Sequence, residues 1–474
     1  MTQPTYEQLL DENRQLRAEN AQLKPRVAQL EDHVARLEAQ VQRLTAQLQE
    51  ALRAAKRQAA PFSKGGPKPN PKPPGRQAGE HYGPKAHRAI PQGPPDEILD
   101  APLPESCPHC GGTLVEDGQS TQYQMEIPRR PIVRRIEIHR GRCRKCGRRV
   151  HGRHPLQTSD ALGAAGSQLG PEAQAALVHL NKDAGLSHGK IADLFATMFG
   201  LSITPGGVCQ AMLRAGRRGE PIYHDLRASV SKARWVVPDE TGWRIGGELA
   251  WLHAFVTELA TVYDAAMGRG YEVAEAILGE RYAGTMIHDG WSPYDRFLWA
   301  DHQQCLAHLL RRCKNLLETA TGGAVIFPRQ VHDLLLDALN LRDRRDAAGV
   351  SPHGLAVAIG RLNARLDRML RWIRTHPDNE RFAKHLARHR RHLFTFLRQT
   401  GIDATNYRVE QALRPAAVNR KVWGGNRTLA GAHAQSVLLT VLRTCRQQGR
   451  DRFTFLVDLL CGRPVHLALL PAGP

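Results

Sequence analysis

The sequence contains no long apolar run, and this absence argues against a membrane-spanning helix. A helical span needs ~18 or more consecutive apolar residues, and no stretch of this chain approaches that length. The N-terminal residues Met1–Pro4 lead into a charged segment without the apolar core of a secretory signal. We therefore expect a cytoplasmic protein that has no membrane partner.

Acidic residues are scarce relative to basic ones. The chain has 46 Asp and Glu against 66 Lys and Arg, which gives a formal net charge of +20 at pH 7. Such an excess attracts polyanions through electrostatics that salt screens. Nucleic acid is therefore the predicted partner, and we expect the protein to associate with the nucleoid. The 474 residues exceed one ordinary domain, so several domains are predicted.

Leucines recur every seven residues near the N-terminus and predict a coiled coil over residues 5–57. Asn, Val or Leu follows each leucine four residues later and completes the a and d positions of six heptads. Val at a with Leu at d favours a parallel two-stranded coiled coil, so we expect a homodimer. A single amphipathic helix packed on its own chain is the alternative, and Pro25 predicts a kink or a restarted helix. The predicted seam consists of Leu9, Leu16, Leu23, Leu30, Leu37 and Leu44 with Asn13, Asn20, Val27, Val34, Val41 and Leu48.

Residues 58–98 are predicted to form an extended basic linker. Ten prolines and six glycines lie between Pro61 and Pro95, where six basic residues face the single acid Glu80. This composition cannot bury enough apolar surface to fold by itself. The linker either lies along DNA phosphates or acts as a spacer, because charge alone carries no sequence specificity.

Cysteine occurs only nine times, an odd number, and four of the nine form two CxxC pairs. This pattern favours metal ligation in a reducing compartment over a disulfide framework. Alternating apolar residues at 123–127 and 132–138 predict strands between the pairs. We therefore expect a zinc ribbon over residues 99–155 with one structural Zn²⁺, and four unligated thiols are the alternative. The predicted ligands are Cys107, Cys110, Cys143 and Cys146.

The same segment is strongly basic. Residues 129–153 hold eleven Lys or Arg against the single acid Glu137, which predicts a surface that contacts the DNA backbone. The contacts are expected from Arg134, Arg135, Arg142, Arg144 and Lys145.

Helical signals dominate residues 160–230. Pro171 begins one predicted helix, Ser187 caps a second, and Thr204 precedes a third that follows a turn at Gly200. A helix, a glycine-containing turn and a further helix match the layout of a helix-turn-helix that binds DNA. Plain packing of a small helical bundle is the alternative.

The region from 234 to 290 predicts a sheet whose strands end in acidic residues. Asp239 and Asp289 each follow an apolar strand, and these two strands are expected to lie side by side. Two carboxylates presented together suit a pair of Mg²⁺ ions that clamp a phosphoryl transfer. Aspartates at strand ends also cap turns, so spacing alone leaves that alternative open. Strands are predicted at 235–238, 249–256, 260–263 and 284–288, with a helix at 271–278.

The order of these segments resembles bacterial insertion-sequence transposases of the DDE type, particularly the insertion-sequence sixty-six family. The resemblance covers nearly the whole chain and implies a multidomain α+β protein. Residues 231–474 would form an RNase H-like catalytic domain with a helical insertion at about 306–398. The motifs that carry the resemblance are Asp239–Trp243, His288–Trp291, His302–Arg311, Thr405–Glu410 and the pair Arg420–Lys421.

The resemblance also implies an activity and its site. Asp239, Asp289 and Glu410 would form a catalytic triad that holds two Mg²⁺ ions, with Mn²⁺ as a substitute. The expected reactions are DNA cleavage at the terminal inverted repeats and strand transfer to target DNA, and a need for accessory proteins of the same element is left open. Further DNA contacts are expected from Arg414, Arg420 and Lys421.

The family suggests a second candidate position for the third acid. Several family members carry a glutamate further along the chain, at the position of His433 here. If that glutamate were the true third acid, this copy would be impaired. A catalytically inactive zinc-ribbon DNA-binding protein, either a repressor or a decayed transposase, is therefore the alternative function. Arg414 is expected to pair with Glu410 or with DNA, and Pro415 predicts an end or a kink of the Glu410 helix.

Two further groups of side chains are predicted not to bind metal or catalyse. For the first group, a second zinc site is disfavoured because helical spacing would spread its four candidate ligands around the helix axis, so packing or DNA contact is expected. The tryptophans near the acids are expected in the core or in a substrate wall, with base stacking as the alternative. These groups are His302, Cys305, His308 and Cys313, and Trp243, Trp251 and Trp291.

Overall fold

The computed structural model divides into two units, Met1–Gln124 and Met125–Pro474, and each is described by itself. The predicted linker falls mostly on residues 56–90, which lie outside the described residues. Within the described part, no helix combines the length with the apolarity that crossing a membrane requires. The structure describes residues 6–55, 91–116, 118–124, 127, 130–161, 168–372 and 374–469.

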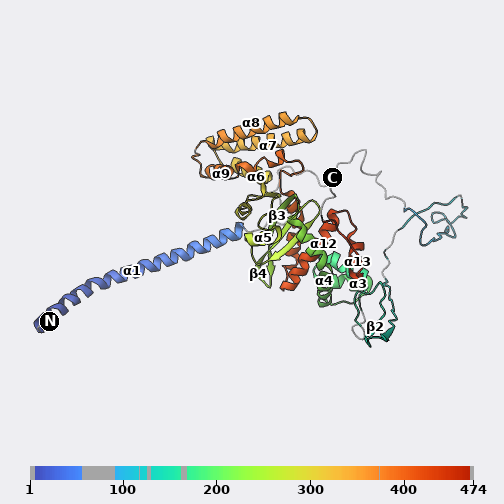
Figure 1. Ribbon diagram of the computed structural model, residues 1–474. Coiled ribbons are helices and arrows are strands. Elements are labelled where there is room, and N and C mark those ends of the chain that lie inside the picture. The colour runs from blue at the N-terminus through green and yellow to red at the C-terminus, as the bar shows by residue number, and fades with distance from the viewer. Residues whose placement is uncertain are drawn as a thin grey trace. The chain divides into compact units, whose positions relative to one another are not determined.

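The N-terminal segment forms one long helix, α1 (Tyr6–Ala55), which is the blue ribbon of Figure 1. The predicted restart at Pro25 is wrong, because the helix runs through this residue. Proline removes one hydrogen bond from the ladder, and helix-favouring Leu, Gln, Glu, Arg and Ala continue on both sides. The apolar seam side chains from Leu16 to Leu44 are 50–61% exposed. The helix alone therefore leaves its apolar stripe uncovered, and the coiled-coil dimer stays a prediction.

The basic cysteine region contains less strand than the alternation of its residues predicts. A short antiparallel hairpin pairs β1 (Arg140–Arg142) with β2 (Arg149–His151) around the second CxxC pair. The strands predicted at 123–127 and 132–138 are absent from the described residues of these segments. Ile132 and Val133 are 73% and 92% exposed, so these apolar side chains have no packed face to form a strand against.

Three helices follow where the sequence places them, namely α2 (Pro171–Lys182), α3 (His188–Phe199) and α4 (Pro205–Val230). Ser187 and Thr204 accept hydrogen bonds from backbone N–H groups of the first turns of α3 and α4. Gly200 ends α3 with a left-handed φ of 65°, a conformation that glycine adopts without strain. The predicted helix layout is confirmed, and its role in DNA binding remains a prediction.

The central sheet has the order β5-β4-β3-β6-β7. Strands β3, β4 and β5 are antiparallel, whereas β6 and β7 are parallel to β3 and to each other. Three strands, a crossover helix and a fourth strand were expected and are confirmed, while β7 was missed because its four residues lack apolar alternation. The elements are β3 (Trp235–Ile245), β4 (Glu248–Val256), β5 (Thr261–Ala266), α5 (Tyr271–Leu278), β6 (Thr285–His288) and β7 (Asp301–Gln304).

Helices make up most of the remaining chain. The segment predicted as a helical insertion is helical in the structure, and three further helices follow it. A short 3-10 helix, η2 (Ser292–Arg296), connects β6 to β7, and two more interrupt the insertion at Gly322–Val325 and Arg390–His392. The helices are α6 (Leu306–Thr319), α7 (Ile326–Asp346), α8 (Pro352–Leu370), α9 (Pro377–Arg388), α10 (Thr395–Arg398), α11 (Tyr407–Trp423), α12 (Leu429–Gln447) and α13 (Arg452–Cys461).

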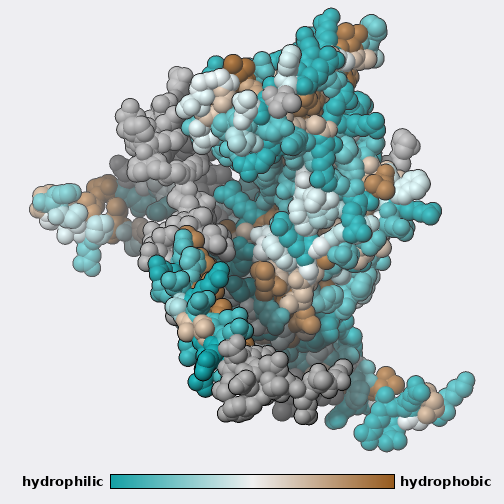
Figure 2. All heavy atoms as spheres, turned by 90° about the vertical axis from the view of Figure 1, so that its left-hand side faces the viewer, coloured by the Kyte–Doolittle hydropathy of each residue, from teal (hydrophilic) through white to brown (hydrophobic). Residues whose placement is uncertain are grey.

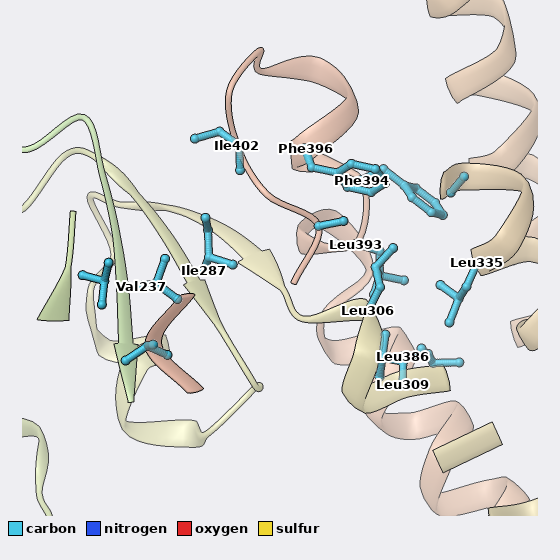
Figure 3. Close-up of a cluster of buried hydrophobic side chains, with 14 of the residues drawn as sticks. Val237, Ile287, Leu306, Leu309, Leu335, Leu386, Leu393, Phe394, Phe396 and Ile402 are labelled. Atoms are coloured by element: carbon cyan, nitrogen blue, oxygen red, sulfur yellow. The ribbon is translucent and has the colours of Figure 1, made fainter. Parts of the chain in front are cut away.

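One apolar core joins the sheet to the helical insertion. Figure 3 shows Val237 and Ile287 from the sheet in the same cluster as Leu306 of α6, Leu335 of α7 and Leu386 of α9. Successive strand residues point to opposite faces, so Val236 belongs instead to the core on the other face, together with residues of α4, α5 and α12. The insertion therefore extends the core of the sheet on one face, and α4 and α12 cover the other.

We predict that charged residues at two seam positions break the dimer of the full chain. Leu30→Glu with Leu37→Glu should place carboxylates at d positions and halve the mass in solution, because a buried charge at the seam is unfavourable. Ala35→Glu with Ala39→Glu lies outside the seam and should leave the mass unchanged. Analytical ultracentrifugation distinguishes the two, and an equal mass for both variants would contradict the coiled coil.

Candidate active site

The parallel pairing of β3 with β6 brings two aspartates to the same region of the sheet. Trp235 pairs with Thr285 and Val236 with Met286, an offset of 50 residues. Asp239 and Asp289 are also 50 residues apart in the sequence. If the β3–β6 register is extended past its last pair, these two aspartates therefore stand opposite each other. Asp239 does not end its strand as the sequence predicts, since β3 continues to Ile245 through its antiparallel pairing with β4.

Asp239 lies in an environment that disfavours its charge. Burial raises the pKa of the Asp239 carboxyl to about 7, and the negative charges of Glu240, Asp289 and Glu410 contribute to this rise. The backbone N–H of Glu240 donates to Asp239 Oδ1 at 2.8 Å, which opposes the rise in pKa. Carboxylates from the end of β6 and from α11 therefore lie near enough to act on Asp239 of β3.

Local hydrogen bonds hold the Asp289 turn. Asp289 Oδ1 accepts the backbone N–H of Trp291 at 2.9 Å, and the Gly290 N–H donates to His288 Nδ1 at 3.1 Å. Gly290 has a φ of 90°, and a Cβ there would lie 2.4 Å from Gln304 Nε2. Glycine is therefore needed at this position. Burial holds the pKa of His288 well below its usual range, so the imidazole that supports the turn is neutral.

Glu410 stands in the first turn of α11. Asn406 is the residue that precedes α11. Its side-chain amide lies 3.5 Å from Asp239 Oδ2 and connects the helix start to β3. The side chain within ion-pair distance of Glu410 is His308 of α6 at 3.7 Å, and not Arg414 as the sequence suggested. Of the predicted end or kink at Pro415, the end is wrong, because α11 continues through this residue to Trp423.

His433 occupies a different environment from Glu410. It lies in α12, and its Nε2 is 3.0 Å from Glu220 Oε1 of α4. Its ring also meets the ring of Tyr223 edge to face at 5.7 Å. The side chain thus faces α4, while Glu410 influences Asp239 electrostatically. This contrast supports Glu410 rather than position 433 as the third acid.

The donor set of these acids suits a hard divalent cation. Carboxylate oxygens are the ligands that Mg²⁺ prefers, and mutually repelling carboxylates are stabilised when a cation binds among them. Across the described ranges, no group of three or more His, Cys, Asp or Glu side chains is arranged to hold a metal ion. The acids therefore match Mg²⁺ in their chemistry, and the side chains would have to converge further to hold it.

The two CxxC pairs form matching turns. The N–H of Cys107 donates to the carbonyl of Gly112 and the N–H of Gly111 to that of Cys107. Around the second pair, Cys143 N–H donates to Arg148 O and Gly147 N–H to Cys143 O. Backbone hydrogen bonds lower the pKa of the Cys107 and Cys143 thiols, which favours the thiolate that zinc requires. The pairs belong to separate units, so the four-cysteine site stays a prediction.

Most residues expected to contact DNA are accessible. Arg420 is only partly accessible. Its guanidinium donates a hydrogen bond to the carbonyl of Gly242 in β3 and helps attach α11 to the sheet. The exposed residues are Arg134, Arg135, Arg142, Arg144, Lys145, Arg414 and Lys421.

The second group of candidate zinc ligands is dispersed by the fold. His302 lies in β7 and α6 begins at Leu306, so these residues do not share the single helix that the sequence suggested. Cys305 and Cys313 are fully buried, which supports the expected packing role. Trp243 is also buried, and its indole N–H donates to Asn426 Oδ1 at 2.8 Å.

A mixed sheet that gathers acidic side chains in a strongly basic chain is typical of an enzyme that acts on nucleic acid. A model of the transposase IS66 family matches residues 166–434, more than half of the chain, so the chain belongs to that family. This confirms the resemblance drawn from the sequence, and it makes DNA the partner. No curated protein matches the chain.

We predict that the purified protein contains one Zn²⁺ that Cys143→Ala removes. Metal binding to such sites contributes directly to folding, so the variant should also lose order in the ribbon. Elemental analysis measures the zinc content, and Cys209→Ala serves as the control that retains it. Zinc that is absent from the wild type, or undiminished in Cys143→Ala, would contradict the four-cysteine site.

We also predict that stability without divalent cations falls as the pH rises through about 7. The folded protein keeps a proton on Asp239 up to about pH 7, whereas the unfolded chain releases it near the ordinary value of 3.8. The folded state binds more protons between these values, so this contribution to stability is present at low pH and is lost as pH rises.

Asp239→Asn should remove this dependence. Denaturant unfolding in a chelator at about pH 5 and about pH 8 measures it, with the exposed hairpin variant Glu248→Gln as the control that keeps the wild-type behaviour. Equal pH dependence in the wild type and Asp239→Asn would contradict the raised pKa.

Proposed function

We propose that this transposase cleaves DNA strands by water attack and joins the freed 3′-hydroxyl to target DNA, with Asp239, Asp289 and Glu410 as its metal-binding triad. The observation that carries the proposal is that Asp289, at the end of β6, and Glu410 of α11 both lie close enough to Asp239 of β3 to act on its charge. Burial and the other two carboxylates act together on the pKa of Asp239. Aspartates that only cap turns would not be expected to lie near two other carboxylates.

The sheet topology supports an RNase H-like catalytic domain. Three antiparallel strands followed by two parallel ones, in the order β5-β4-β3-β6-β7, form the framework implied by the family resemblance. Asp239 lies on the central strand β3, Asp289 directly follows β6, and Glu410 lies on the first helix after the insertion. In this proposal residues 231–474 are the catalytic domain, and 306–398 is the insertion that shares its core.

The residues of the chain prepare the site for Mg²⁺. When bound, the ions would activate the attacking water or hydroxyl and stabilise the leaving oxygen of an in-line displacement. Asn406 and the Glu240 N–H orient the Asp239 carboxylate, while the Trp291 N–H orients Asp289. Glu410 is carried by a helix anchored in the core through Val409 and Leu413. Side chains held by neighbours in this way lose less entropy when the substrate binds.

Basic segments outside the catalytic domain are proposed to hold the DNA. The ribbon arginines and the helices of residues 160–230 would bind the terminal repeats, and the net charge of +20 would attract the backbone. Figure 2 shows a largely hydrophilic face over the described residues, which suits a wet, charged interface. The inactive DNA-binding alternative is disfavoured because the environment of His433 does not suit a third acid.

We predict that Asp239→Asn, Asp289→Asn and Glu410→Gln each reduce DNA cleavage and strand transfer below detection. Each change removes a carboxylate that the metal ions need, but leaves the basic DNA-contacting residues in place. The assay uses DNA carrying the element ends with Mg²⁺ or Mn²⁺, and binding is measured on the same DNA.

Glu248→Gln, on the exposed hairpin between β3 and β4, is the matched control and should keep both binding and cleavage. Full activity of Glu410→Gln would remove Glu410 from the triad. A wild type that binds the ends without cutting them, and gains activity on His433→Glu, would support the inactive alternative instead.

A further inference from the structure

Arg269, between β5 and α5, makes three side-chain contacts beside the proposed site, although its side chain is 46% exposed. Its guanidinium lies between two indole rings, 4.7 Å from the ring centroid of Trp251 and 4.6 Å from that of Trp291. Arg269 Nε donates to Glu240 Oε1 at 2.7 Å. One side chain thus contacts β3, β4 and the turn that follows β6.

The partner of Arg269 needs a cation. The Glu240 side chain is only 3% exposed, and a buried carboxylate without a compensating charge is strongly unfavourable. The hydroxyl of Tyr294 donates to its other oxygen, Oε2, at 3.3 Å. Burial and the neighbouring acids raise the pKa of Tyr294 well above its usual range, so this hydroxyl stays a donor.

Two of the residues that Arg269 contacts, Glu240 and Trp291, are each hydrogen-bonded to a proposed catalytic acid. Glu240 follows Asp239 in β3, and its backbone N–H donates to Asp239 Oδ1 at 2.8 Å. Trp291 closes the Asp289 turn, since its backbone N–H donates to Asp289 Oδ1 at 2.9 Å. Arg269 therefore links the local frames of both aspartates.

The β3–β6 register brings the two aspartates together, but the paired residues stop before reaching them. The ladder between β3 and β6 consists of the pairs Trp235 with Thr285 and Val236 with Met286, three residues short of the aspartates. Beyond that point β3 pairs with β4 on its other side, while β6 ends at His288. A connection made by side chains is then needed to fix how far apart the two carboxylates stand.

We propose that Arg269 is a positioning residue that sets the separation of Asp239 and Asp289, so that both carboxylates can share divalent cations. The proposal rests on the function proposed above. Arginine suits this role because its planar guanidinium stacks on an aromatic ring through each face while its N–H groups bind a carboxylate in the plane. Lysine could keep the charge but not the two stacked contacts.

This arrangement also bears on the tryptophans. Trp251 and Trp291 turn their ring faces to Arg269, so a nucleic-acid base could stack between them only by displacing the guanidinium. In this proposal the two rings hold the guanidinium in place. This role adds to the core or substrate-wall position expected from the sequence, since Trp291 also packs against the core, and it argues against base stacking.

The test separates positioning from folding with paired variants of the full chain. Arg269→Gln alone would leave Glu240 buried without a cation and lower the thermal stability. The double variant Glu240→Gln with Arg269→Gln removes both charges and should recover most of that stability. If Arg269 positions the acids, the double variant still binds Mn²⁺ roughly 10- to 100-fold more weakly, as changes to residues that support metal ligands do.

Mn²⁺ binding is measured by calorimetry on the protein without DNA, and cleavage is followed as Mn²⁺ is titrated. Arg269→Lys should weaken Mn²⁺ binding while keeping its stability, and excess Mn²⁺ should restore much of the cleavage rate in each stable variant. Arg296→Gln is the matched control, because Arg296 also stacks on a ring, that of Tyr271 at 4.3 Å, without joining the two aspartates.

The outcomes distinguish the two proposals. A double variant that binds Mn²⁺ as tightly as the wild type, and cleaves equally at limiting Mn²⁺, overturns the role of Arg269 and leaves the proposed function intact. A wild type that neither binds Mn²⁺ nor cleaves DNA overturns both. Weakened metal binding in the double variant and Arg269→Lys, with unchanged DNA binding and an unaffected Arg296→Gln, supports the positioning role.

Discussion

The parallel pairing of β3 with β6 is the constraint on which the proposed active site depends. Its offset of 50 residues equals the spacing of Asp239 and Asp289, so one register decides that the two acids lie together. A slip of one residue would turn every side chain of one strand to the opposite face. The apolar residues at 235–237 and 286–287 resist such a slip, because alternate members belong to cores on the two faces of the sheet. The buried core thereby specifies the position of polar groups beyond its edge.

Glu410, the proposed third acid, is held near β3 because the long insertion that precedes it packs against the sheet. Glu410 lies 121 residues beyond Asp289 in the chain, and closing so long a loop is entropically costly unless the loop is itself folded. Helices α6 to α10 share the apolar cluster of the sheet, as Figure 3 shows for Leu306, Leu335 and Leu386. Ile402 and Val409 continue the same cluster into the start of α11. The insertion therefore acts as a rigid connection that returns the chain to β3.

Sequence patterns predicted this fold best where apolar periodicity and capping agreed. The helices begun by Pro171, Ser187 and Thr204 and the first four strands of the sheet follow from such local signals. Strand β7 could not be found in this way, because Asp301–Gln304 is polar and is specified by its pairing with β6. Pro25 and Pro415 were expected to interrupt helices that instead continue, since one lost hydrogen bond is outweighed by the turns on both sides. No local sequence pattern predicted the contacts of Arg269, because the residues that it contacts lie 18 to 29 positions away in the chain.

The neighbouring acids Asp239 and Glu240 in β3 have opposite electrostatic surroundings. Glu240 is neutralised within the protein, by Arg269 at 2.7 Å and by the hydroxyl of Tyr294. Asp239 is approached by the neutral amide of Asn406, and among the described residues no ion pair joins it to a basic side chain. Alternation along the strand explains how two adjacent carboxylates come to face such different surroundings. A carboxylate that is buried, surrounded by other acids and left without an internal cation is stabilised most by a cation from outside. Glu240 is thus suited to support the site and Asp239 to bind the metal.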